Sequence, residues 1–482
     1  MGQELKIGRG PPLELRVLND PGPVSIRKIL GPGLILAALG VGMGETFMWP
    51  RLVIVFGPEI RWIATVGLII QTFVTAEIAR WTYFTGESIF AAGRRIHPII
   101  MWYFYIIAIL VYIWPGHVVT GSGALGLLLG TDWVPIAIVS MIAIAVILVL
   151  APYQIYKTVK TILLIAISMM IAVSFIVAIL VGSPSHWAEA LYGTVAFGYW
   201  TDLMSSETWL PLIVGAMAFI GPSGMQQMWY TLWAREENAG MSAYMPKITG
   251  LIFGKEEAWR EAGFYFDVNS DEEIAKWKRW RRLNIYDAVI SFALITYFTT
   301  LFFTVLSMKA AELSPAALSA IKAGKTLVAI KAIASAFTYV SPVLYPLWFI
   351  VMFLVGWKMS FGIFDAFARG QADMTFYLFK KAQKLGMRKW YYIWVAIVTG
   401  VGIITTLAGA AKGPAFLLDV LAFMSPLIMG SYCLLLLYVN NKMVPKRIRM
   451  SWISTIVLAG GAAFYLVSLF YCTFVIGAIP TG

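Results

Sequence analysis

The chain has 482 residues, of which 60% are hydrophobic and only 13% are charged. Soluble domains usually carry about 25% charged residues. Apolar runs of about 20 residues, long enough to cross a bilayer, recur along nearly the whole length. This composition excludes an ordinary soluble protein and predicts an all-α polytopic membrane protein, with the lipid bilayer as its first partner.

The residues that usually carry enzyme chemistry are sparse and scattered. Cys433 and Cys472 both fall in apolar runs, which indicates inert buried thiols rather than a disulfide framework or a thiolate metal site. The three histidines form no cluster, and neither a paired-aspartate nor a Ser/Lys arrangement accompanies them. We therefore expect no enzyme, no cofactor and no ATP-driven machine.

Hydropathy predicts eleven membrane spans. A charged segment at 235–283 is the one sizeable excursion outside the membrane, and the stretches 86–96 and 186–206 are expected to lie along the membrane surface. The predicted spans are 28–57, 60–84, 99–129, 133–151, 155–182, 209–234, 284–308, 338–365, 390–411, 414–440 and 450–478.

The distribution of Lys and Arg predicts the orientation. The N-terminal tail (1–27) and the loops after the even-numbered spans are rich in basic residues, whereas the opposite loops hold few. Cytoplasmic loops carry such an excess, so we expect a cytoplasmic N-terminus, an external C-terminus and a location in the cell membrane. The net charge of +12 is explained in this way without nucleic acid as a partner.

Two predicted spans are interrupted at corresponding places, five spans apart. The first is broken by glycines ahead of Glu45, and the sixth by glycines around Pro222. Paired interruptions of this kind are typical of inverted-repeat transporters, which bind their substrate at the midplane. An alternative is that the glycines only allow close helix packing. The glycines concerned are Gly33, Gly40, Gly42, Gly44, Gly215, Gly221 and Gly224.

These features resemble the Nramp family of divalent-metal transporters, within the LeuT-like superfamily. The resemblance rests on GPG at Gly31–Gly33, on AEIARWTYFTGESIFAAGRR at Ala76–Arg95, and on the GP-centred sixth span. It implies a LeuT-like fold with two inverted five-helix repeats plus an eleventh helix. The implied ranges are 28–440 for the ten-helix core, 28–182 and 209–440 for the repeats, and 450–478 for the added helix.

The chain departs from the family where the metal is bound. The family's aspartate and asparagine on the first span fall on Gly42 and Glu45, and its methionine and histidine on the sixth span fall on Gly221 and Ser223. The family's acidic pair on the third span appears as Pro115 and Val118, with His117 between them. The predicted substrate-binding residues are Gly42, Gly44, Glu45, Ala218, Gly221, Ser223, Gln226 and Asp419, with Glu45 as the single metal ligand.

The changed site predicts a changed substrate. Loss of the thioether removes the preference for soft metals and favours a hard or hydrated cation, and the glycines suggest a roomier site. The resemblance therefore implies a secondary active transporter of a cation, working by alternating access and coupled to H⁺ or Na⁺. Two alternatives stay open: a carrier of a small organic solute such as an amino acid, and a non-transporting sensor on the same scaffold. The oligomeric state is not predicted.

Three ionisable residues have both a functional and a structural interpretation, and a fourth, Asp419, has a functional one. Glu45 binds a cation, an ammonium group or a proton, or else pairs with Arg51 or caps a helix. Lys358 replaces a sodium ion against the first span or carries the coupled proton, or else extends its amine toward the membrane surface. His117 lies where a proton route would start but is also a common kind of buried scaffold residue. Asp419 lies near a polar ligand position of the family.

Overall fold

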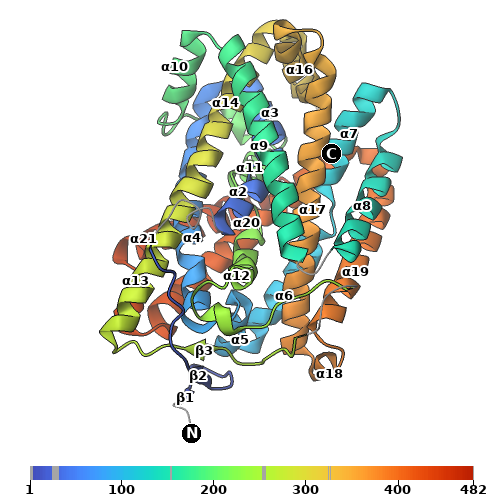
Figure 1. Cartoon of the computed structure of the whole chain (residues 1–482). Coiled ribbons are helices and arrows are strands. Elements are labelled where there is room, and N and C mark those ends of the chain that lie inside the picture. Colours follow the sequence, from blue (N-terminus) through green and yellow to red (C-terminus); the bar gives the residue numbers. More distant parts are fainter. Residues whose placement is uncertain are drawn as a thin grey trace.

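The computed structural model describes residues 4–23, 32–151, 155–251, 257–323, 325 and 327–480, and in it the long helices form one bundle (Figure 1). Ten helical stretches of this part of the chain are long and apolar enough to cross a membrane. Their elements are α2 (Pro32–Gly40), η1 (Gly44–Met48) and α3 (Trp49–Phe56); α4 (Arg61–Thr85); α6 (Pro98–Tyr112) and α7 (Gly116–Leu129); α8 (Trp133–Leu150); α9 (Ile155–Val181); α13 (Asp271–Tyr286), η5 (Asp287–Leu294) and α14 (Ile295–Leu313); α17 (Leu344–Leu378); α19 (Met387–Gly409); α20 (Pro414–Tyr438); and α21 (Trp452–Phe470).

The sixth predicted span is made of two short helices, α11 (Leu210–Ala218) and α12 (Gln226–Glu236), neither of which is long enough to cross a bilayer alone. The first span is interrupted as well, between Gly40 and Gly44. Both predicted breaks are therefore present. The predicted start of the first span at 28, and Gly31 of the GPG sequence, lie outside the described residues.

Three spans differ from the prediction in extent. The third is interrupted at 113–115, where Pro115 lacks the amide hydrogen that a continuous helix needs. The seventh begins at Asp271 rather than 284, because Ser270 caps a helix whose first turn is acidic. The eighth is α17, which runs to Leu378 rather than 365. The segment predicted as a loop over 235–283 is therefore helical in its last part.

Short elements cover both ends of the bundle. In Figure 1, α10 and α16 lie at the upper end, while α5, α18 and the three strands lie at the lower end with the N-terminus. The short elements are η2 (Pro58–Ile60), α5 (Ile89–Ile96), α10 (Pro184–Gly193), η3 (Asp202–Ser205), η4 (Gly240–Tyr244), α15 (Pro315–Lys322), α16 (Val328–Val340), α18 (Lys380–Gln383), η6 (Ala410–Lys412), η7 (Val439–Met443), η8 (Lys446–Ile448) and η9 (Tyr471–Val475).

The N-terminal segment is bound to the lower end of the bundle. Strand β1 (Glu4–Leu5) pairs antiparallel with β2 (Leu13–Leu15), and β2 pairs parallel with β3 (Phe264–Tyr265). Beyond the sheet, the Leu18 amide donates to Glu273 Oε2 at 2.5 Å. The tail and the 235–283 segment, two separate polar regions in the sequence, thus form one small structure across this face.

Candidate functional site

The two broken spans meet at the centre of the bundle. A Cβ atom on Gly44 would lie 2.1 Å from the carbonyl oxygen of Phe219, and one on Gly40 would lie 2.8 Å from Cδ of Pro222. Only glycine allows the first break to approach the second break this closely. These glycines therefore do allow close packing, which was the alternative interpretation of the sequence. The packing brings the two breaks into contact.

Tyr112 stabilises the second break. Between α11 and α12 the chain is non-helical, and Gly221 and Gly224 have φ angles of 84° and 53°, which favour glycine. The Tyr112 hydroxyl donates to the Ser223 carbonyl at 3.0 Å and accepts from the Met225 amide at 2.9 Å. These bonds satisfy backbone groups that the unwound segment leaves unpaired. The sequence gives no signal for this role, because Tyr112 ends an apolar helix far from the break.

The Glu45 carboxylate joins the two breaks. Oε2 accepts the amide of Gly42 at 2.8 Å, and Oε1 accepts the amide of Gly221 at 2.6 Å. The residue is fully buried. The ion pair with Arg51, one alternative for Glu45, is not formed. A single carboxyl side chain therefore holds one backbone group from each of the two predicted repeats.

Lys358 holds the end of α2. Its ammonium group donates to the carbonyl oxygens of Ala38 and Val41, the latter at 2.6 Å. These carbonyls belong to the C-terminal end of an interrupted helix, where a cation is favoured. The side chain is only 1% exposed, so it does not extend to the membrane surface. Lys358 thus lies against the first span and binds the end of its first helix.

His117 lies beside the second break without a hydrogen-bond partner. It lies in the first turn of α7, directly after the interruption of the third span, and its ring stacks on Phe219 with centroids 5.6 Å apart. Among the described residues, none pairs with either ring nitrogen, although the residue is only 2% exposed. The structure therefore brings His117 to the same region as Glu45.

Polar side chains continue along the start of α12. Gln226 donates to Ser223 Oγ at 3.2 Å, and its own carbonyl oxygen has no partner in the described part of the chain. Ala218 is the last residue of α11 and is buried. Gln227 points elsewhere, since its carbonyl oxygen accepts from Thr75 on α4 at 3.0 Å. Of the two glutamines, Gln226 is therefore the one whose side-chain carbonyl oxygen has no partner among the described residues.

Asp419 lies apart from this group and is bound by an arginine. Arg51, on α3, donates two parallel hydrogen bonds to Asp419, on α20, at 2.8 and 3.1 Å. Both side chains are buried. Removing either partner would leave an uncompensated charge, so the pair fastens α3, the second half of the first span, to α20.

The glycine positions are filled in this conformation. A Cβ on Gly42 would lie 2.6 Å from the sulfur of Met359, and one on Gly221 would lie 2.6 Å from the ring of Phe292. The roomier site expected from these glycines is not formed here. The described residues also contain no group of three or more His, Cys, Asp or Glu side chains that would hold a metal ion.

Ion pairs close the lower end of the bundle. Arg235 on α12 donates to Asp373 on α17 at 2.7 Å, and the adjacent Glu236 accepts from Arg369 at 2.6 Å. Arg369 also binds Asp365, four residues earlier on the same helix. The side chains of all five residues are buried. These pairs fasten α12 to α17 at this end of the bundle.

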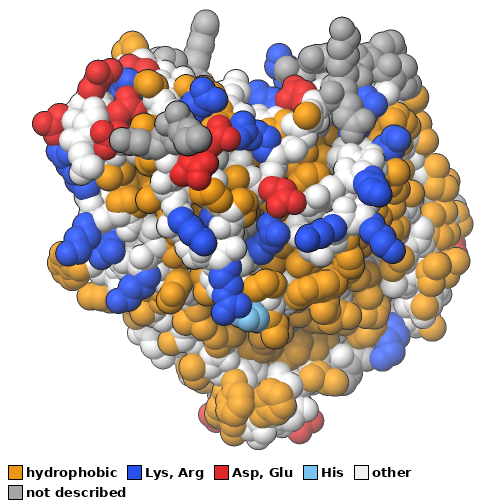
Figure 2. All heavy atoms as spheres, turned by 90° about the horizontal axis from the view of Figure 1, so that it is seen from below, with side chains coloured by type: hydrophobic (Ala, Val, Ile, Leu, Met, Phe, Trp, Pro, Cys, Tyr) orange, Lys and Arg blue, Asp and Glu red, His pale blue; other side chains and the backbone are white. Residues whose placement is uncertain are grey.

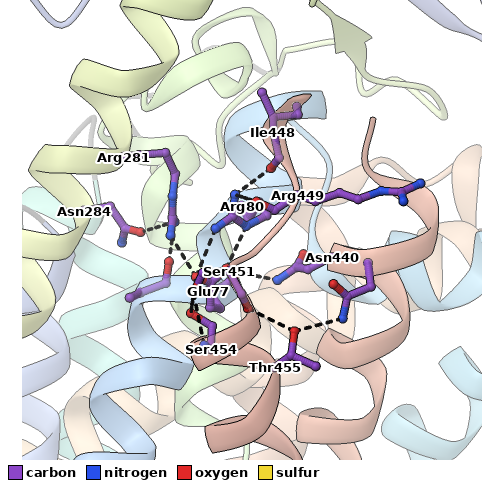
Figure 3. Close-up of polar contacts among 12 residues, drawn as sticks. Glu77, Arg80, Arg281, Asn284, Asn440, Ile448, Arg449, Ser451, Ser454 and Thr455 are labelled. Atoms are coloured by element: carbon purple, nitrogen blue, oxygen red, sulfur yellow. Dashed lines mark hydrogen bonds and ion pairs between the residues drawn. The ribbon is translucent and has the colours of Figure 1, made fainter. Parts of the chain in front are cut away.

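The lower end of α4 is fastened by a second charged cluster. Glu77 accepts hydrogen bonds from Arg80 on the same helix at 2.7 Å and from Arg281 on α13 at 3.1 Å, and Figure 3 shows these side chains converging. Ser454 on α21 donates to the same carboxylate at 3.1 Å. Through these contacts Glu77 ties three spans together: α4, α13 and α21.

No family model and no curated protein matches the chain. Solved transporter structures do match. The Eremococcus coleocola manganese transporter, in complex with an aromatic bis-isothiourea compound, has a TM-score of 0.62 at 14% identity, over 94% of this chain and 89% of that chain. Mhp1, a nucleobase-cation-symport-1 family transporter, has a TM-score of 0.51 at 12% identity, over 92% of each chain.

MhsT in complex with L-phenylalanine has a TM-score of 0.51 at 14% identity, over 92% of this chain and 98% of that chain. At such low identity these likenesses establish the fold, and substrates do not follow from them. The LeuT-like fold predicted from the sequence is thereby confirmed. The paired breaks are the feature of this fold that carries the candidate site.

Proposed function

We propose that this protein is a secondary active transporter, working by alternating access, that moves a small cation across the cell membrane. The observation that carries the proposal is the Glu45 carboxylate bound to the Gly42 and Gly221 amides. A buried carboxylate is retained in a membrane when it has a task. Here it joins the two interrupted helices, which are the parts expected to move against each other.

The same contacts argue against an amino acid as the substrate. An amino-acid carboxylate would need the free backbone amides of a glycine-rich break, and the Glu45 carboxylate already occupies those of Gly42 and Gly221. A cation or an ammonium group is attracted to Glu45 instead. A fully dehydrated divalent metal is disfavoured by the single carboxylate, so the cation is a hydrated or organic one.

Lys358 supports the proton as the coupling ion. Its ammonium group satisfies the carbonyls of Ala38 and Val41, which would otherwise be available as ligands for a sodium ion. With a protein ammonium group at this place, sodium has no role to fill there. His117, with both ring nitrogens unpaired among the described residues, lies beside the breaks and stays the candidate for the start of a proton route.

The experiment is an uptake panel in proteoliposomes, with Mn²⁺, Ca²⁺, monovalent cations, organic amines and neutral amino acids, under imposed pH or sodium gradients. We expect uptake of a cation that follows the pH gradient and is indifferent to sodium. Glu45→Gln should reduce this uptake at least about tenfold, because it removes the charge that joins the breaks. The matched control is Glu59→Gln on η2, a partly exposed carboxylate away from both breaks.

Equal uptake by Glu45→Gln and wild type would contradict the proposal, provided that both elute as folded protein in size-exclusion chromatography. Uptake of a neutral amino acid alone would support the organic-solute alternative. A complete lack of uptake across the panel would favour the sensor alternative.

A further inference from the structure

A pocket lies at the lower end of the bundle, away from the central site. It has a volume of about 560 Å³ and is lined by residues of α6, α17, α18 and α19, with α18 at the bottom of Figure 1. This volume is in the range of sites that bind small molecules. Its lining residues are Tyr105, Thr375, Phe379, Lys381, Ala382, Lys384, Leu385 and Trp390.

Two lysines supply the charge of the pocket. Lys381 and Lys384 are both exposed, and neither has an ion-pair or hydrogen-bond partner among the described residues. The lining contains no carboxylate, so the pocket has a net charge of two positive. The surrounding lower face is rich in Lys and Arg side chains (Figure 2). An unpaired cluster of this kind attracts an anion.

The walls of the pocket are apolar and continue into the membrane-facing surface. Phe379 lies against Tyr105 and Trp102 in edge contacts, and Trp390 lines the pocket from α19. The helices that supply Tyr105 and Trp390 expose large apolar side chains farther along, among them Ile106 and Ile397. Aromatic residues concentrate at the membrane–water interface, so the pocket lies at headgroup depth.

We propose that this pocket binds the headgroup of an anionic phospholipid, with the phosphate on Lys381 and Lys384 and the acyl chains along α6 and α19. Basic pockets between transmembrane helices on the cytoplasmic side of a membrane, where the positive-inside rule places this end of the bundle, are suited to such headgroups. A soluble polyanion would make no use of the apolar walls, and a zwitterionic lipid would gain little from two unpaired ammonium groups. Such binding does not depend on the transported solute.

Native mass spectrometry of the full chain in detergent, titrated with phosphatidylglycerol or phosphatidylcholine, counts the bound lipids. We expect tight binding of phosphatidylglycerol, and binding on the order of tenfold weaker in the double variant Lys381→Gln/Lys384→Gln, because the variant removes both charges of the pocket. The matched control, Lys380→Gln/Lys389→Gln, removes the same charge from exposed positions outside the pocket and should bind as wild type does.

In a third set of measurements, inorganic phosphate and glycerol 3-phosphate are added as competitors of phosphatidylglycerol. Both should compete poorly, because they lack acyl chains. Equal binding of phosphatidylcholine, equal loss in both double variants, or full competition by soluble phosphate would each overturn the proposal. All four lysines are exposed, so the variants are expected to fold, and a thermal melt of each checks this.

Discussion

At the scale of single residues, removing Lys358 tests whether its ammonium group takes the place of a sodium ion. Replacing it by alanine leaves the carbonyls of Ala38 and Val41 without their donor, which costs about 1–3 kcal/mol for an unsatisfied buried group. It also opens a space lined by those oxygens. We expect Lys358→Ala to melt at a lower temperature than wild type and to regain stability in NaCl but not in choline chloride.

The measurement is a thermal melt in each salt at equal ionic strength, with wild type as the sodium-independent reference. A sodium effect of equal size in wild type, or none in the variant, would mean that Lys358 does not stand in place of a sodium ion.

The charged residues of the site are the part that the sequence predicts best. Glu45 and Lys358 stand out because an ionisable group within an apolar span is rare. Pairings between residues that lie far apart in the sequence are less visible. Arg51 and Asp419 are 368 positions apart, and no local sequence pattern around either residue predicts that they pair. Tyr112 escapes prediction for the same reason, because its partners in the second break come from another span.

At the scale of elements, the contact between the two breaks depends on Gly44. An added Cβ would meet the Phe219 carbonyl, a backbone atom that cannot move without shifting the end of α11. We expect Gly44→Ala to destabilise the protein by about 1–3 kcal/mol through overpacking and to reduce transport sharply. Gly400→Ala in α19 is the control, since nothing lies within 4 Å of the position that its Cβ would take.

Thermal melts and initial uptake rates of the two variants check this expectation. Alanine is a better helix former than glycine, so Gly400→Ala should be neutral or slightly stabilising. Similar behaviour of both variants would show that the close approach of the breaks is unimportant.

The elements differ in how far the sequence predicts them. Long apolar helices and the glycine-rich breaks are encoded locally, and the structure has them. The interruption of the third span at 113–115 is absent from the prediction, although Pro115 and Gly116 mark it. At this interruption the carbonyl oxygen of Ile113 accepts a hydrogen bond from the Thr405 hydroxyl, on α19, at 2.7 Å. This contact from a distant span satisfies a backbone group that the break leaves without a helical partner.

At the scale of the whole molecule, the N-terminal segment, a polar tail by its sequence, is part of a sheet. Strands of two or three residues leave no periodic pattern, and β2 and β3 lie about 250 positions apart along the chain. The sheet forms because the lower ends of the helices bring both segments to one face. Such long-range assembly is the part of this fold that sequence reasoning does not reach.

The orientation of the whole molecule in the membrane can be tested with one exposed residue at each end of the bundle. Lys380 on α18 and Lys331 on α16 are exposed at opposite ends, as Figure 1 shows for their helices. The positive-inside rule places the basic lower end in the cytoplasm. In intact cells, a membrane-impermeant maleimide should therefore label Lys331→Cys but not Lys380→Cys, and permeabilised cells should show labelling of both.

The wild-type chain is the unlabelled control for this experiment, because its two native cysteines, Cys433 and Cys472, are buried. Labelling of Lys380→Cys alone in intact cells would place the N-terminus outside, since the N-terminal strands lie at the same end as α18 (Figure 1). The lipid pocket would then face the outer leaflet, and its anionic ligand would have to come from that side of the membrane.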